Sequence, residues 1–144
     1  MLIETKNKTI NLVLRTRKIV DIANLLKNKN FEDAFIRAYS ELDMEALSKI
    51  IFKLAEDENG NAVFDKSDEV YDYIDECRKE EIMPIDLYKK IAEALNDEGF
   101  FKKKMSKKEL TALISNPLST IDVNKIIKSS AEKAMENIVS AELQ

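Results

Sequence analysis

The chain has 144 residues, of which 44% are hydrophobic and 35% charged, with a net charge of -4. This composition is typical of one soluble helical domain and argues against a basic nucleic-acid-binding protein or a transmembrane protein. With two glycines, no histidine and one cysteine, the chain also lacks the residues for a glycine-rich phosphate loop, histidine proton transfer or an internal disulfide.

The first 14 residues predict a β-hairpin. Apolar Ile10, Leu12 and Leu14 alternate with other residues at the period of a strand. Ile3 and Thr5 would pair with this strand across a turn at residues 6–8. Because two strands alone are marginally stable in water, we expect the hairpin to pack against helices.

Five amphipathic helices are predicted between the hairpin and residue 98, each with apolar residues recurring at helical spacing. Their apolar faces are Ile19, Ile22, Ala23 and Leu26; Phe31, Ala34, Phe35 and Ala38; Leu47, Ile50, Ile51 and Leu54; Val70, Tyr73, Ile74 and Cys77; and Tyr88, Ile91, Ala92 and Leu95. Thr16 and Ser67 are expected to cap helix N-termini, Pro84 suits a first helical position, and Gly99 suits the position after a helix.

The last third of the chain has a different pattern. Ser106 and Glu109 have the spacing of a capping box and predict a short helix that stops at Asn116-Pro117. A last helix over 119–142 would have the seam Val123, Ile127, Ala131, Ala134 and Ile138. We expect this helix to dock weakly, to be partly disordered, or to be ordered by a partner, because its small apolar seam offsets little of the entropy of ordering it.

These patterns together predict a mainly α fold. We expect a compact bundle of about five short amphipathic helices with a small N-terminal β-hairpin, plus a C-terminal helical extension. The expected division is a helical domain over residues 1–101 and a lysine-rich linker with the amphipathic extension over residues 102–144.

No group of residues makes a strong catalytic or metal site. Asp57, Asn59, Asn61, Asp65 and Asp68 follow part of a calcium-loop pattern, but Ala62 stands where that loop needs glycine. An acidic solvated loop is therefore the favoured interpretation. Likewise, Cys77 lies on an apolar helix face, which favours a packed core thiol over a reactive one. The many carboxylates are better explained as helix surface and caps than as an acid/base pair.

The lysines of residues 102–108 leave three interpretations open: a solvated face, a patch that docks another protein, or a nucleic-acid patch. The lysines are Lys102, Lys103, Lys104, Lys107 and Lys108. Phe100 and Phe101 precede them and serve either as an apolar anchor for a partner or, as we favour, to close the core. The acidic stretch over 56–81 would oppose binding of a nucleic acid if it lies close to these lysines in the fold.

Two segments and their order carry a resemblance to a known family. The first is Val70-Tyr71-Asp72-Tyr73-Ile74-Asp75-Glu76. The second, after a charged break, is Asp86-Leu87-Tyr88-Lys89-Lys90-Ile91-Ala92-Glu93-Ala94-Leu95, followed by Glu98-Gly99-Phe100-Phe101. With the preceding hairpin and helices, this order resembles the tail assembly chaperones of long-tailed phages and prophages of Gram-positive bacteria. The likeness covers about residues 1–101.

The resemblance implies a role without catalysis, cofactor or metal. Such chaperones coat the tape-measure protein, recruit tail-tube subunits in the host bacterial cytoplasm and leave before the virion is mature. The expected partners are therefore the tape-measure and tail-tube proteins, not a membrane; self-association is left open. The expected contact residues are Phe100, Phe101, Lys102, Lys103, Lys104, Ile127, Ala131, Ala134 and Ile138. The alternative function is a small helical nucleic-acid-binding regulator that uses the Lys102–Lys108 cluster.

Overall fold

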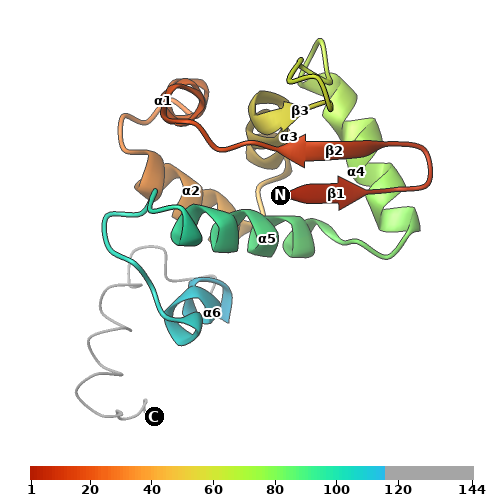
Figure 1. Ribbon diagram of the computed structural model, residues 1–144. Helices are drawn as coiled ribbons and strands as arrows, with labels where there is room; N and C mark the ends of the chain where they lie inside the picture. Colours follow the sequence, from red (N-terminus) through yellow and green to blue (C-terminus); the bar gives the residue numbers. More distant parts are fainter. Residues whose placement is uncertain (116–144) are drawn as a thin grey trace. The chain divides into compact units, whose positions relative to one another are not determined.

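The computed structural model describes residues 1–115, which form a mainly helical fold with a small antiparallel sheet (Figure 1). The chain divides into two compact units, the first being Met1–Lys104 and the second beginning at Met105. The predicted seam at Val123, Ile127, Ala131, Ala134 and Ile138 and the Asn116-Pro117 stop lie outside the described residues. The predicted fold class, mainly α with an N-terminal hairpin, is confirmed.

The sheet of the first unit contains one more strand than the sequence predicts. Strands β1 (Leu2–Glu4) and β2 (Thr9–Leu12) form the hairpin, with Ile3 opposite Ile10. Strand β3 (Ala55–Glu56) pairs with the other edge of β2, so that Asn11 lies opposite Glu56. The strand prediction extended too far, because β2 ends at Leu12 and Leu14 is only half-buried.

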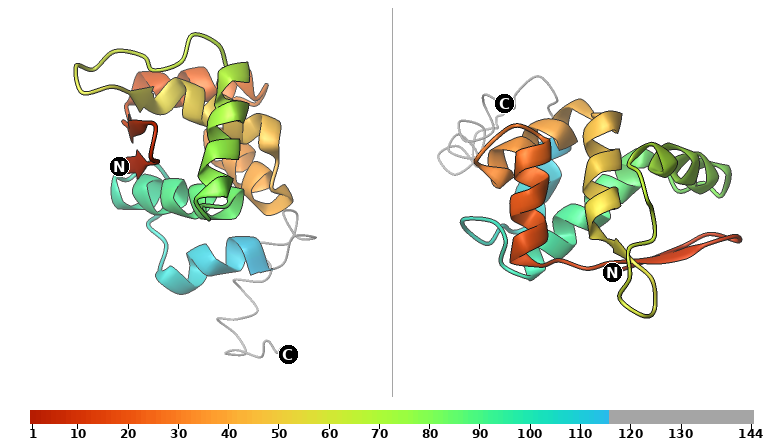
Figure 2. Two further views of the ribbon diagram at one scale, coloured as in Figure 1. Left: turned by 90° about the vertical axis from the view of Figure 1, so that its right-hand side faces the viewer. Right: turned by 90° about the horizontal axis from the view of Figure 1, so that it is seen from above.

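Five helices of the first unit follow the predicted periodicity. They are α1 (Thr16–Leu25), α2 (Phe31–Glu41), α3 (Met44–Leu54), α4 (Asp68–Lys79) and α5 (Pro84–Asp97). Every predicted core residue in these helices is buried except Leu26, which follows α1 and is half-buried. Helix α3 packs against α1, α4, α5 and β2, an arrangement that Figure 2 shows from two further sides. The apolar face of α3 is therefore the centre of the core.

Helix starts show which capping predictions hold. Pro84 is the first residue of α5, as predicted. Arg15 rather than Thr16 is the N-cap of α1, so that predicted cap is wrong. Ser67 is the N-cap residue of α4 as predicted, although its side chain makes no capping hydrogen bond. The side chains of Asn30 and Asp43 do cap, accepting hydrogen bonds from main-chain N–H groups at the starts of α2 and α3.

Aromatic rings join α2 to α5. Phe31, Phe35 and Tyr39 lie one turn apart along α2, with neighbouring ring centroids 5.9 and 5.8 Å apart. Tyr88 of α5 stacks on Tyr39 at 5.4 Å with an interplanar angle of 7°. Burial, with a smaller contribution from Glu93, raises the pKa of the Tyr39 hydroxyl to about 12.

Helix α6 (Lys107–Ser115) belongs to the second unit. The predicted capping box is present at its start: the Ser106 N–H donates to the Glu109 carboxylate at 2.8 Å, and the Glu109 N–H donates to the Ser106 hydroxyl at 3.2 Å. This reciprocal pair satisfies two N–H groups at the helix start that have no partner within the helix.

Candidate functional site

The segment that leaves α5 carries the predicted contact residues of the first unit. Gly99 has a φ of 80°, a left-handed conformation that favours glycine. The Phe100 N–H then donates to the Leu95 carbonyl at 2.9 Å, which closes the helix end. The prediction that Gly99 follows the helix end is confirmed.

Phe101 closes the core rather than facing a partner. Its side chain is buried, and its ring centroid lies 6.1 Å from that of Phe35 on α2. The adjacent Lys102 N–H donates to the Glu32 carboxylate at 2.6 Å, which fastens the same segment to the start of α2. Phe101 is therefore not available as an exposed anchor in this conformation, whereas Phe100 is half-buried.

The lysines of the predicted site are exposed. Lys102, Lys103 and Lys104 are exposed at the end of the first unit, and Lys107 and Lys108 are exposed in the second. Within the described residues, these five side chains form no ion pair. The other predicted contacts, Ile127, Ala131, Ala134 and Ile138, lie outside the described residues.

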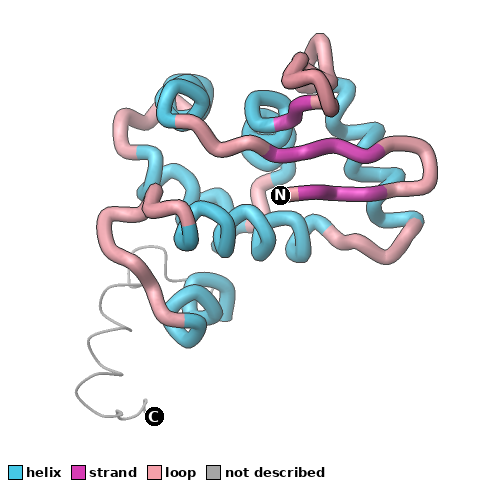
Figure 3. Tube along the Cα trace, in the orientation of Figure 1, coloured by secondary structure: helices cyan, strands magenta, loops and turns pink. Residues whose placement is uncertain are grey.

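The segment that follows part of the calcium-loop pattern forms a mostly exposed loop, residues 57–67, between β3 and α4. Figure 3 draws this loop as a pink tube. One carboxylate oxygen of Asp57 accepts hydrogen bonds from the N–H groups of Asn59 and Asn61, at 2.8 and 2.9 Å. This carboxylate therefore fixes the backbone of its own loop. Within residues 1–115, no group of acidic or cysteine residues is arranged to hold a metal ion.

Cys77 is fully buried on α4. Burial is the largest of the effects that raise the pKa of its thiol, and a hydrogen bond with Tyr73 opposes it. The Tyr73 hydroxyl also donates to the Ile3 carbonyl at 3.2 Å, which joins α4 to β1. The favoured interpretation of Cys77 as a core thiol agrees with this position.

A charged cluster that the sequence did not predict surrounds Glu56. Its side chain is only 7% exposed, and its Oε2 lies 2.5 Å from both the Arg15 guanidinium and the Lys18 ammonium. The hydrogen bond from Lys18 is the main reason that the pKa of Glu56 is lowered, while burial acts in the opposite direction. Glu56 is thus a buried, ionised carboxylate held by two cations from the start of α1.

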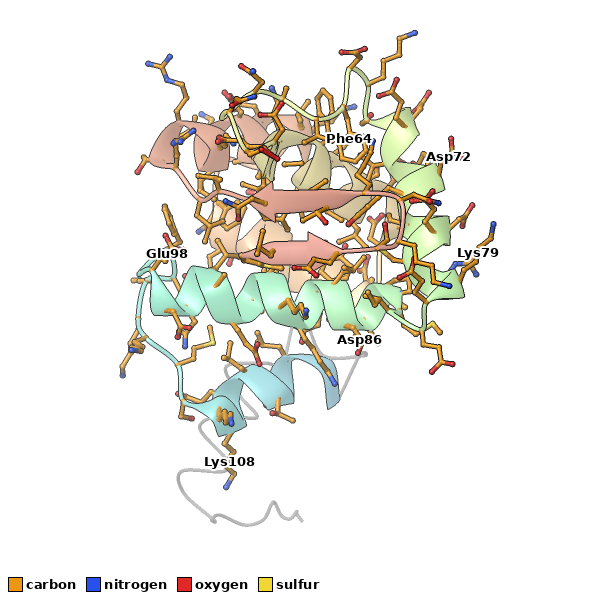
Figure 4. The ribbon with its side chains drawn as sticks, turned by 45° about the vertical axis from the view of Figure 1, so that its right-hand side comes forward. Phe64, Asp72, Lys79, Asp86, Glu98 and Lys108 are labelled. Carbon is orange, nitrogen blue, oxygen red and sulfur yellow. The ribbon has the colours of Figure 1, made fainter. Side chains whose placement is uncertain are left out.

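This cluster forms one side of a pocket of about 370 Å³. The start of α1 contributes Arg17, the end of α3 contributes Phe52 and Lys53, and the loop after β3 contributes Gly60 and Phe64. Figure 4 labels Phe64 on that loop. No periodic pattern reveals such a pocket, because its residues come from the start of α1, the end of α3, β3 and the loop after β3, which meet only after folding. An acidic residue directly after the apolar run of α3 was the one available signal.

Comparison with known proteins gives no match to any family model, to any curated protein or to any solved structure. No helix within residues 1–115 is long and apolar enough to cross a membrane.

Proposed function

We propose that this chain is a tail assembly chaperone of a long-tailed phage or prophage. In this role it binds the tape-measure protein, keeps that protein soluble and recruits tail-tube subunits. The proposal includes a site of action in the host bacterial cytoplasm and release before the virion is mature. The chain acts through binding, without catalysis.

One observation carries the proposal: the part of the chain that resembles the family ends where the first unit closes. The resembling segments lie on α4 and α5 and end at Phe101, whose ring packs on Phe35. Residues 102–108, which we call the basic segment, follow directly, and their five lysine side chains are exposed. A closed helical domain followed by an exposed charged segment suits a protein that holds a partner reversibly, because exposed charged contacts attract a partner while each contributes little to affinity.

The basic segment also starts from a fixed point. Since the Lys102 N–H is bound to Glu32, the three lysines 102–104 follow a segment anchored on α2. Anchoring lowers the entropy lost when such side chains meet an acidic partner surface. This property supports a docking role for the lysines over a merely solvated face.

The first test is genomic. A tail-tube gene upstream and a very long helical reading frame downstream of this gene are expected. A neighbourhood with neither of these genes would contradict the proposal.

The second test is co-purification of the downstream product with the tagged full chain. Changing all five lysines of the basic segment to glutamine should reduce the recovered partner several-fold. The matched control changes five exposed lysines elsewhere, namely Lys6, Lys29, Lys79, Lys89 and Lys90. Equal recovery of the partner with both variants would show that the basic segment does not bind it specifically. Recovery of nucleic acid with a steep salt dependence, in place of the partner, would favour the nucleic-acid-binding regulator.

A further inference from the structure

The pocket beside Glu56 has more positive than negative charge. Its lining includes four cationic side chains, Arg15, Arg17, Lys18 and Lys53, and two anionic ones, Asp21 and Glu56. Four cations against two anions leave a net charge of +2.

The cations of the pocket fall into two pairs with different roles. Arg15 and Lys18 both hold the Glu56 carboxylate, at 2.5 Å. Arg17 and Lys53 form no ion pair with a described residue; the Lys53 ammonium lies 5.7 Å from the centroid of the Phe52 ring. Glu56 therefore balances part of the charge of the first pair, whereas no described carboxylate balances the second pair.

The sign of the ligand's charge follows from the net charge of the pocket. Attraction to the four cations and repulsion from Asp21 and Glu56 both scale with the charge of the ligand, so a net charge of +2 favours an anion. A carboxylate would accept charge-assisted hydrogen bonds from Arg17 and Lys53. The half-buried Phe52 provides an apolar surface next to these cations, so the favoured ligand is a carboxylate borne on an apolar body.

We propose that this pocket receives one acidic side chain of a helix of the partner protein, with Arg17 and Lys53 holding the carboxylate and Phe52 packing against the neighbouring apolar residue. Amphipathic helices present acidic and apolar side chains one turn apart in this way. The identity of the partner as a protein rests on the proposed function. The pocket itself rests on the residues just described.

The experiment titrates the isotope-labelled full chain with a 20-residue amphipathic helical peptide that has one central glutamate beside a leucine. Amide shifts are expected in residues 15–18, 52–56 and 60–64. Replacing the glutamate of the peptide with glutamine should weaken binding about tenfold, the effect of two partly exposed ion pairs. Equal binding of both peptides, shifts confined to other residues, or no shifts at millimolar peptide would overturn the proposal.

Variants of the chain give the complementary result. Arg17→Gln with Lys53→Gln should also weaken binding of the glutamate peptide about tenfold, and this variant should no longer distinguish the two peptides. The control Lys89→Gln with Lys90→Gln removes two exposed cations of α5 and should bind as the unaltered chain does. Weakening by the control to the same extent would show that the effect is net charge and not the pocket.

Benzoate distinguishes a partner side chain from a free small acid. Binding of benzoate as tight as that of the glutamate peptide would overturn the assignment to a protein helix. If the peptide does not bind but the tape-measure protein still co-purifies, the pocket proposal is wrong and the proposed function is unaffected. If the peptides bind as expected but no tape-measure protein is recovered, the proposed function is wrong and the pocket proposal is supported.

Discussion

The ammonium of Lys18 lies 2.5 Å from the carboxylate of Glu56, which joins α1 to β3 across 38 positions of sequence. The same ammonium also donates to the carbonyl of Leu54, the last residue of α3, at 3.3 Å. One side chain of α1 therefore holds both the end of α3 and the short strand that follows it. This cross-connection fixes the edge of the sheet and one wall of the pocket.

Replacing Glu56 with glutamine should lower the free energy of unfolding by about 1–3 kcal/mol, because two hydrogen bonds to a charged acceptor become bonds to a neutral one. Urea unfolding followed by circular dichroism measures this loss. The control is Glu58→Gln, which removes an exposed carboxylate of the adjacent loop and should change stability by less than about 0.5 kcal/mol. Equal effects of the two variants would show that the ion pairs contribute no net stability.

The contribution of Glu56 should also depend on pH. Because its pKa is lower in the folded chain than in the unfolded chain, the stabilisation is complete above the ordinary glutamate pKa and is lost as pH falls through the folded value. The difference in Tm between the unaltered chain and Glu56→Gln should therefore be constant from pH 6 to 8 and shrink below about pH 4.5. A difference that grows on acidification would contradict the direction of the pKa shift.

Glu81 should be replaceable by glycine with a gain in stability. It follows α4 with a φ of 64°, which costs a residue with a side chain about 1 kcal/mol, and its side chain is exposed. We expect Glu81→Gly to raise the free energy of unfolding by about 0.5–1 kcal/mol. Lys79→Gly, within the last turn of α4, should instead lower it by about 1 kcal/mol.

Gly99 provides the converse test of the same effect. It has a φ of 80°, and no atom beyond its two chain neighbours lies within 4 Å of where a Cβ would be. Gly99→Ala should therefore lower the free energy of unfolding by about 1 kcal/mol through backbone conformation alone. An unchanged stability would mean that the segment after α5 relaxes without cost.

Phe101 should contribute to stability far more than Phe100. Phe101→Ala removes a buried ring that packs on Phe35, and we expect a loss of about 3–4 kcal/mol. Phe100→Ala, at a half-buried position, should cost about 1 kcal/mol. Thermal unfolding of both variants checks this order, and the reverse order would restore Phe101 as a candidate partner contact.

The helical core could be predicted from sequence because its signal is local. Leu47, Ile50, Ile51 and Leu54 recur at the helical period, and all four are at most 1% exposed. Strand β3 could not be predicted in this way, because two residues are too few to show any period. Its existence depends on α3 delivering Ala55 and Glu56 beside β2.

The caps and the pocket show a second limit of sequence reasoning. The N-cap of α1 is Arg15, one residue before the predicted Thr16. Arg15 has an extended backbone conformation and Thr16 is already helical, a difference that the sequence pattern does not reveal. Similarly, the charges that meet at the pocket lie in α1, α3 and β3, so that only tertiary packing brings them together. The exposed lysines of residues 102–108, by contrast, are recognisable from composition alone.

The central claim is that this chain acts by holding another protein in solution. The most direct measurement is the soluble fraction of the tape-measure protein from the same genome, co-expressed with and without the full chain. The account predicts a several-fold larger soluble fraction when the chain is present, with the two proteins eluting together on size exclusion. An unchanged soluble fraction and separate elution would contradict it.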